Sequence, residues 1–253
     1  MDKLLNSPLM AASDKAFWHA YVDFYAQHFP ADIDGTVVEF GVLNGNSVRW
    51  LTERFPSAAL VGVDILAVQP TWPQGPRIRY AQVDQDSEAQ MSAFFAGIPA
   101  PHLIIEDGSH IPRHQSRCLR LGLEKLAAGG LYVLEDIHTS HPEHSLFQSE
   151  FGKVKEAQTS LHVLLAFDHA KRLGLAALTG AQLDRLAGGH FSGEQLQALY
   201  ALVEHLHVYK RATLPTQCWR CGSTDFDYLS WHCACGVPLM GNADSMSIVL
   251  RKK

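Results

Sequence analysis

Acidic residues follow short apolar runs at two points of the chain, which read Ile105-Glu106-Asp107-Gly108-Ser109-His110 and Val133-Leu134-Glu135-Asp136-Ile137-His138. The apolar runs, at 102–105 and 131–134, are typical of buried parallel strands. In an open α/β sheet, ligands bind just beyond the carboxyl ends of the strands. We therefore expect these carboxylates and a histidine to converge at one crevice, where oxygen ligands suit a hard divalent cation such as Mg²⁺.

Apolar strands and amphipathic helices alternate through the first part of the chain. We expect strands at 36–40, 59–64, 78–83, 102–105 and 131–134, and helices at 13–29, 48–55, 87–96 and 113–127. This alternation predicts an α/β fold with a doubly wound parallel sheet. Further along, we expect helices at 154–173, 179–187 and 192–202, and strands at 206–212 and 246–250.

The composition argues against several classes of protein. The 253 residues suit one large domain, or a domain with a small appendage. A net charge of −5 gives no basic surface for nucleic acid or anionic lipid. The sequence has neither an apolar stretch as long as a membrane span nor the pattern of a signal peptide at its first residues. We expect a cytoplasmic protein without a membrane partner.

A glycine turn, Gly41-Val42-Leu43-Asn44-Gly45-Asn46-Ser47, joins the first expected strand to the helix that follows it. Asp64 lies nineteen residues after Gly45, at the end of the next strand, where a carboxylate can bind the ribose of a nucleotide-like cofactor. The turn lacks G-x-G-x-x-G and a Lys-Ser/Thr ending, so it indicates neither a dinucleotide nor a phosphate-binding loop. For the glycines alone, an ordinary strand-to-helix turn is the alternative.

These motifs resemble those of class I S-adenosylmethionine-dependent methyltransferases. More narrowly, they resemble the metal-dependent sugar O-methyltransferases of the macrocin and mycinamicin type and the cephalosporin hydroxylase-like proteins. The residues that carry the resemblance are 39–47, Val63-Asp64, 82–86, 107–110 and 129–136. The resemblance implies a Rossmann-like, seven-stranded methyltransferase sheet, S-adenosylmethionine and Mg²⁺ as cofactors, and a homo-oligomer.

The resemblance also implies roles for single residues. The cofactor-binding residues would be Glu39, Gly41, Gly45, Ser47, Asp64, Asp84 and Asp86. Mg²⁺ would be held by Asp107, Glu135 and Asp136, and the catalytic residues would be Asp107 and His110. His110 would take the proton of the attacking hydroxyl, which is a poor nucleophile until a metal or a base activates it. Helix capping or substrate binding is the alternative for His110, and Mn²⁺ or iron is the alternative for Mg²⁺.

Neighbouring polar residues are expected to be structural. Glu106 is expected to be a solvated carboxylate or one at the sheet edge, and Cys118 a core residue. The histidines at 138, 141 and 144 are expected in the substrate pocket or on the surface.

Four of the five cysteines lie close together near the end of the chain. Cys218-x-x-Cys221 is followed after eleven residues by Cys233-x-Cys235. Two pairs of thiolates are typical of a tetrahedral structural Zn²⁺ site, and the first pair resembles a zinc-ribbon knuckle. The second pair is one residue shorter than usual, so His232 is an alternative fourth ligand.

The cysteines predict a division of the chain. A methyltransferase core with an N-terminal helix at 1–213 would be followed by a zinc-ribbon-like insert at 214–240, in the last hairpin of the sheet, and by a final strand at 241–253. About 27 residues cannot build a core without a stabilising metal.

Together these features predict an S-adenosylmethionine- and Mg²⁺-dependent O-methyltransferase acting on a hydroxyl of a sugar or small natural product. One alternative is an RNA or protein methyltransferase that uses the zinc ribbon as a reader, although the composition provides no basic face. The other is a noncatalytic or hydroxylase-auxiliary protein on the same fold, because fold alone does not fix activity.

Overall fold

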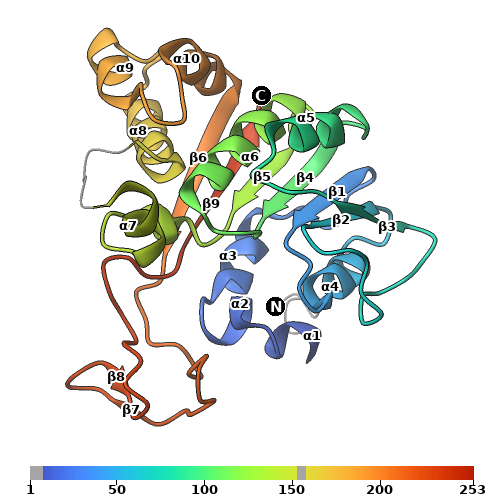
Figure 1. Cartoon of the computed structure of the whole chain (residues 1–253), viewed down its shortest axis with the longest axis vertical. Coiled ribbons are helices and arrows are strands. Elements are labelled where there is room, and N and C mark those ends of the chain that lie inside the picture. Colours follow the sequence, from blue (N-terminus) through green and yellow to red (C-terminus); the bar gives the residue numbers. More distant parts are fainter. Residues whose placement is uncertain (1–7, 153–157) are drawn as a thin grey trace.

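A seven-stranded sheet forms the centre of the molecule in the computed structural model, which describes residues 8–152 and 158–253 (Figure 1). Its strand order is β3-β2-β1-β4-β5-β9-β6. The bounds are Thr36–Phe40 (β1), Ala59–Asp64 (β2), Ile78–Gln82 (β3), Pro101–Glu106 (β4), Leu131–Leu134 (β5), Val203–Lys210 (β6) and Met246–Lys252 (β9). The first five strands are parallel, and β9 runs antiparallel to β5 and β6. The predicted doubly wound, mostly parallel sheet is confirmed.

Helices cover both faces of this sheet. Their bounds are Pro8–Ala11 (α1), Asp14–Phe17 (α2), Tyr21–His28 (α3), Asn46–Arg54 (α4), Glu88–Ala96 (α5), Pro112–Lys125 (α6), Ser145–Phe151 (α7), Ser160–Arg172 (α8), Gly180–Leu186 (α9) and Gly193–Leu202 (α10). A short 3₁₀ helix, η1, spans Ile137–Ser140. In Figure 1, α8, α9 and α10 gather at the β6 end of the sheet.

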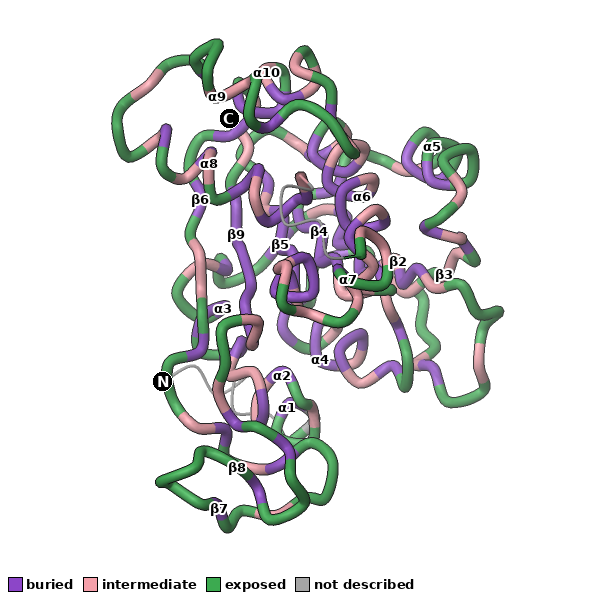
Figure 2. The backbone as a smooth tube through the Cα atoms, turned by 60° about the vertical axis from the view of Figure 1, so that its left-hand side comes forward, coloured by how far each residue is buried: buried purple, intermediate pink, exposed green. Residues whose placement is uncertain are grey.

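Alternate residues of the central strands belong to two separate hydrophobic cores, one on each face of the sheet. Val38 and Ile104 pack with the helices α5, α6, α8 and α10, whereas Val37 and Leu103 pack with α3 and α4. This division follows from the period of two in a strand, because successive side chains point to opposite faces. Burial on both faces explains why these strands read as continuous apolar runs, and Figure 2 shows β4, β5 and β9 largely buried.

Three predicted elements need correction. The helix expected at 13–29 is broken into α2 and α3, because Ala20 has a left-handed φ of 57° that an α-helix cannot continue through. The helix expected at 154–173 begins at Ser160, and 153–157 lie outside the described residues. The strand expected at 206–212 begins three residues earlier, at Val203, directly after α10.

The segment between β6 and β9 forms a small unit of its own. It contains a two-stranded sheet of Phe226–Asp227 (β7) and His232–Cys233 (β8), and it projects away from the main sheet in Figure 1. Most of its residues are exposed (Figure 2). Its buried cluster includes two cysteines and one residue from the start of the chain, Trp18.

Within the ranges that the structure describes, no helix has both the length and the apolar character needed to cross a bilayer. The cytoplasmic location stays a prediction.

Candidate active site

Three parallel strands end side by side and place the predicted site residues at one edge of the sheet. The backbone pairing continues one residue beyond each strand. The Asp107 N–H donates to the Phe40 carbonyl at 3.0 Å, and the Glu135 N–H donates to the Glu106 carbonyl at 2.9 Å. The residues that follow β1, β4 and β5 therefore lie in one row, as the rule for parallel sheets predicts.

Gly41 is required where β1 and β4 meet. It has φ +87°, and a Cβ there would lie 2.0 Å from the Asp107 carbonyl oxygen. From the sequence, we expect a glycine here because a bound ligand would approach the backbone closely. In the structure, the close neighbour is the backbone that carries Asp107.

Two carboxylates and one imidazole form a group that fits a divalent cation. One ligand atom from each of Asp107, His110 and Asp136 lies within 4.8 Å of the others. His110 Nε2 is 3.9 Å from Asp107 Oδ1 and 3.8 Å from Asp136 Oδ2. His110 and Asp136 both have a left-handed φ, at 58° and 49°. Such backbone strain in residues other than glycine is concentrated at functional sites.

Lys15 of α2 lies among the same carboxylates. Its Nζ is 2.5 Å from Asp107 Oδ2, 2.7 Å from Glu135 Oε2 and 3.8 Å from Glu39 Oε1. Burial would lower the pKa of Lys15, but these three acids outweigh it and raise the pKa well above its usual value. Lys15 is therefore a buried ammonium, and Glu135 is paired with it. The role of Glu135 as a metal ligand stays a prediction.

Asp136 is surrounded by donors that hold it ionised. Tyr21 donates its hydroxyl to Asp136 Oδ1 at 2.7 Å, while His19 Nδ1 and His138 Nδ1 lie 3.6 and 3.8 Å from the same oxygen. Burial would raise the pKa of Asp136, but the three nearby histidines, His110 included, and the Tyr21 hydroxyl hold it below its usual range. The carboxylate is thus available to a cation.

The electrostatics of the other groups follow from burial. Burial raises the pKa of Glu39 to about 7, although Lys15 opposes the shift. For His110, burial lowers the pKa, but Asp136, Asp107 and Glu106 outweigh it, so the net shift is upward. The imidazolium is thereby favoured, and a divalent cation bound by the same acids would instead favour the neutral ring.

The glycine turn is fastened to the end of β2. Asp64 Oδ2 accepts the Val42 and Leu43 amides at 2.9 and 3.3 Å, and Asp64 Oδ1 accepts the Leu66 amide at 2.9 Å. Each carboxylate oxygen has two lone pairs, so Asp64 retains acceptor capacity for a ribose. Gly45, with φ 75°, is the N-cap of α4, and the buried Ser47 lies in the first turn of that helix.

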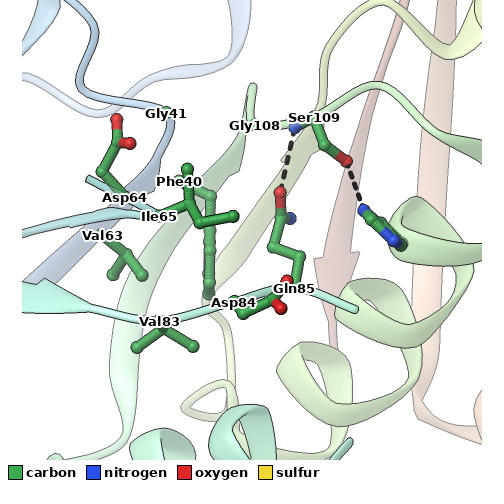
Figure 3. Close-up of a pocket in the computed structure, with 11 residues that line it drawn as sticks. Phe40, Gly41, Val63, Asp64, Ile65, Val83, Asp84, Gln85, Gly108 and Ser109 are labelled. Carbon is green, nitrogen blue, oxygen red and sulfur yellow. Dashed lines mark hydrogen bonds between the residues drawn. The ribbon is translucent and has the colours of Figure 1, made fainter. Parts of the chain in front are cut away.

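A pocket of about 150 Å³ lies beside this turn (Figure 3). The residues that line it include Gly41, Asp64, Ile65, Asp84 and Ser109. The pocket is bounded by the ends of three strands, with the β4–α6 loop on one side. Apolar walls beside a carboxylate suit a nucleoside such as the adenosine of the predicted cofactor.

Glu106 is a buried residue, so its predicted position in solvent or at the sheet edge is wrong. Gln85 Nε2 donates to the buried Glu106 Oε1 at 2.8 Å. Gln85 Oε1 accepts the Ser109 amide at 2.9 Å (Figure 3). Burial raises the pKa of Glu106 to about 7. Gln85 therefore ties the β3–α5 loop to the β4–α6 loop. The predicted core position of Cys118 is confirmed.

Asp86, predicted to bind the cofactor, lies apart from the pocket lining. Its carboxylate is 3.0 Å from Arg113 Nε, 3.1 Å from His114 Nε2 and 3.4 Å from Arg117 Nη1. His114 lines the pocket and lies 2.7 Å from Ser109 Oγ. Asp86 is thus linked to the pocket through His114, and its cofactor role stays a prediction.

A second cavity, of about 390 Å³, opens over the carboxylates. It shares Gly41, Asp64, Ile65 and Gly108 with the first pocket. Its other lining residues include Lys15, His19, Asp107, His110, Glu135 and Asp136. The smaller pocket therefore adjoins an acidic cavity that holds a histidine.

The four cysteines of the 214–240 segment also meet. Cys218 Sγ is 3.7 Å from Cys235 Sγ, and Cys221 Sγ is 3.4 Å from Cys233 Sγ. These distances are far longer than a disulfide bond and close to the sulfur separation of about 3.8 Å in tetrahedral zinc thiolate sites. His232, the alternative ligand, instead lies 2.6 Å from the Ser230 carbonyl through Nδ1.

The comparisons with known proteins find methyltransferases among the similar chains. No family model matches the chain. The chain is 34% identical over 147 residues to the 8-demethyl-8-α-L-rhamnosyl tetracenomycin-C 2′-O-methyltransferase of Streptomyces olivaceus, covering 54% of this chain and 38% of that protein. It is 28% identical over 134 residues to the mycinamicin VI 2″-O-methyltransferase of Micromonospora griseorubida, covering 49% and 33%.

Solved structures of a methyltransferase from the mycinamycin biosynthetic pathway match over more of the chain. One, in complex with Mg and SAH, gives a TM-score of 0.61 at 25% identity, covering 80% of this chain and 50% of that one. Another, with Mg, SAH and mycinamycin VI, gives 0.62 at 20% identity, covering 97% and 54%. The chain has the class I methyltransferase fold. The predicted resemblance is confirmed. The chain spans about half the length of these solved relatives, and 38% and 33% of the length of the two relatives compared by sequence.

Sequence reasoning misses Lys15, His19 and Tyr21, which reach the acidic end of the methyltransferase sheet from the N-terminal segment. The sequence pattern there indicates only an aromatic-rich amphipathic helix. The left-handed turn at Ala20 lies between α2 and α3, and side chains on both sides of it reach the carboxylates. No motif in the sequence marks that turn.

The contact at Gly41 predicts a large cost for adding one methyl group. We expect Gly41→Ala to lower the free energy of unfolding by at least about 2 kcal/mol, because the left-handed φ and the overlap with the Asp107 carbonyl both oppose it. Urea denaturation measures this. Gly180→Ala is the matched control, since a Cβ there meets nothing within 4 Å; equal losses in both variants would contradict the assignment.

Proposed function

We propose that this protein transfers the methyl group of S-adenosylmethionine to a hydroxyl of a sugar on a natural product, with Mg²⁺ at the acidic cavity. The observation that carries the proposal is the shared wall of the two cavities, formed by Gly41, Asp64, Ile65 and Gly108. A cofactor in the first would present its methyl group toward an acceptor in the second. The named relatives that methylate sugars support the acceptor class.

The glycine turn and its neighbours would bind the cofactor. We assign Asp64 to the ribose hydroxyls and Asp84 to the adenosine, since both line the smaller pocket. Glu39, Gly41, Gly45 and Ser47 would surround the methionine part. Asp86 would act through His114, whose ring it holds at the rim of the pocket.

The acidic cavity would bind the acceptor. Asp107, Glu135 and Asp136 would hold Mg²⁺, and their oxygen donors, with His110 nearby, fit such an ion. When bound, the ion lowers the pKa of an acceptor hydroxyl. His110 Nε2, in the same cavity, would take the hydroxyl proton. Asp107 and Asp136 would keep the His110 ring oriented toward the acceptor.

We also propose that 214–240 form an insert that binds one structural Zn²⁺ through Cys218, Cys221, Cys233 and Cys235. The sulfur separations support this. Burial would raise the pKa of the Cys218 thiol, but backbone amides of Cys221 and Arg220 and the neighbouring thiols lower it to about 7. The Cys235 backbone amide lowers the pKa of Cys233, but burial and hydrogen bonds with the other three thiols outweigh it and raise that pKa to about 12. The zinc assignment therefore rests on the sulfur separations.

Cofactor binding is tested by calorimetric titration of S-adenosylhomocysteine. We expect a Kd in the micromolar range for the natural protein and at least about tenfold weaker binding for Asp64→Ala, which removes the ribose acceptor and frees the glycine turn. Asp34→Ala, an exposed acid before β1, is the control. Absence of binding to the natural protein would reject the methyltransferase proposal and favour an auxiliary role.

Metal dependence is tested by following methyl transfer to a rhamnosylated polyketide in Mg²⁺ or EDTA. We expect EDTA to abolish turnover, and Asp136→Asn to lower kcat/KM by about a hundredfold or more, because the amide carries no charge for the metal. Asp184→Asn, on the exposed side of α9, should keep the natural rate. EDTA-resistant turnover would remove Mg²⁺ from the mechanism.

The zinc assignment is tested by metal analysis of purified protein. We expect about one Zn²⁺ per chain, lost in Cys221→Ser together with several degrees of thermal stability, because the insert has a small core of its own. Cys118→Ala is the control for zinc content. Cys118 lies in α6 and is buried in the main core, not in the insert. Zinc retained in Cys221→Ser would contradict a four-cysteine site.

A further inference from the structure

Lys15 is a positively charged side chain placed where a metal would be expected. Its Nζ contacts Asp107 Oδ2 and Glu135 Oε2 at 2.5 and 2.7 Å, and the side chain is only 8% exposed. Both acids belong to the set proposed to hold Mg²⁺. The ammonium holds Asp107 Oδ2 and Glu135 Oε2, so a divalent ion bound by these two acids would have to share them with it or displace it.

The backbone around Lys15 is fixed by the cysteine insert and the strand before it. The Thr216 amide donates to the Phe17 carbonyl at 2.9 Å, and Tyr209 donates its hydroxyl to the His19 carbonyl at 3.1 Å. Trp18 is buried in the same cluster as Cys218 and Cys233. Short helix α2 thus has one face on the insert and its lysine in the carboxylate row.

The chain also holds Trp18 from a second side. The Arg211 guanidinium lies 4.8 Å above the Trp18 ring, and Arg211 itself pairs with Asp244 at 2.7 Å and donates to the Leu239 carbonyl at 2.7 Å. His19 Nδ1 lies 2.9 Å from Ser245 Oγ. Both flanks of the insert therefore contact the residues that follow Lys15, so the ammonium is a tethered ion and not a freely moving surface lysine.

Lys15 offsets part of the negative charge that four carboxylates bring to this site. The carboxylates of Glu39, Asp107, Glu135 and Asp136 lie around one centre, and burying them without cations would be strongly unfavourable. Lys15 supplies one positive charge in the structure. A divalent ion would bring two further positive charges to the same carboxylates, so the ammonium and the ion would repel each other at this centre.

We propose that Lys15 is a tethered cation that competes with the divalent ion for Asp107 and Glu135, and that the cysteine insert holds it in that position. The inference rests on the proposed metal site. It assigns Lys15 as a positioning residue that weakens metal binding in the absence of cofactor and acceptor. It also links the two proposed metal sites, since the insert determines where α2 and its lysine lie.

The test measures Mn²⁺ binding to the zinc-loaded protein by the electron paramagnetic resonance signal of free Mn²⁺. Mn²⁺ prefers oxygen ligands, so it reports the carboxylates and not the thiolates. We expect Lys15→Met to bind Mn²⁺ at least about tenfold more tightly than the natural protein, because the competing charge is gone. Lys15→Arg keeps the charge and should stay within about threefold.

A second measurement, the Tm with and without Mn²⁺, allows for a loss of stability in Lys15→Met. Lys15→Met should have a lower Tm without metal, and Mn²⁺ should raise its Tm by more than it raises that of the natural protein. Cys221→Ser, which frees α2 from the insert, should also bind Mn²⁺ more tightly, by a smaller factor.

Unchanged or weaker Mn²⁺ binding by Lys15→Met, or a Tm gain no larger than that of the natural protein, would overturn the proposal. Tighter binding by Lys15→Met without any change in Cys221→Ser would overturn the role of the insert. S-adenosylhomocysteine titration of the same samples reports the cofactor pocket separately, so a failure of competition is distinguishable from a failure of the proposed methyltransferase activity.

Discussion

The burial of several carboxylates at the ends of three neighbouring strands is the constraint on which the rest of the site depends. Two like charges a few ångströms apart repel strongly once water is removed, so each acid needs a nearby cation or donor. Lys15 meets this need for Asp107 and Glu135, and Tyr21 with three histidines meets it for Asp136. The partners come from segments outside the parallel strands, so the N-terminal helices are part of the site.

The same crowding explains the unusual backbone of the strand ends. Gly41 has to pass against the Asp107 carbonyl, which only a residue without a side chain allows. His110 and Asp136 take left-handed conformations that turn their side chains toward each other. The Gln85 side chain joins the β3–α5 loop to the β4–α6 loop, so hydrogen bonds fix this wall of the smaller pocket. Preorganised walls of this kind reduce the entropy lost on binding.

The cysteine insert has a place in this arrangement although it lies outside the sheet. Its small core includes Trp18, and its Trp219 side chain lines a cavity together with Lys15 and Asp107. A unit of this size depends on contacts with its surroundings or on a metal for its stability. It contacts the Phe17 carbonyl of α2 and Trp18 directly after α2, so its folding and the placement of Lys15 are connected.

The sequence by itself determined the sheet, the glycine turn and the row of acids. Apolar runs, their alternation with helices and the acids that follow them are local patterns, and a parallel sheet brings strand ends together by its geometry alone. These local patterns are sufficient to place Asp107, Glu135 and Asp136 at one edge of the sheet.

Only the tertiary structure decided which cations face these acids. Lys15, His19 and Tyr21 lie more than eighty residues before Asp107 in the chain, and their approach depends on one left-handed residue, Ala20. It likewise decided that Glu106 is buried and that Asp86 faces arginines. Periodicity reports which face of an element is apolar, whereas charge pairing depends on contacts between distant segments, and a single sequence carries no local signal for those contacts.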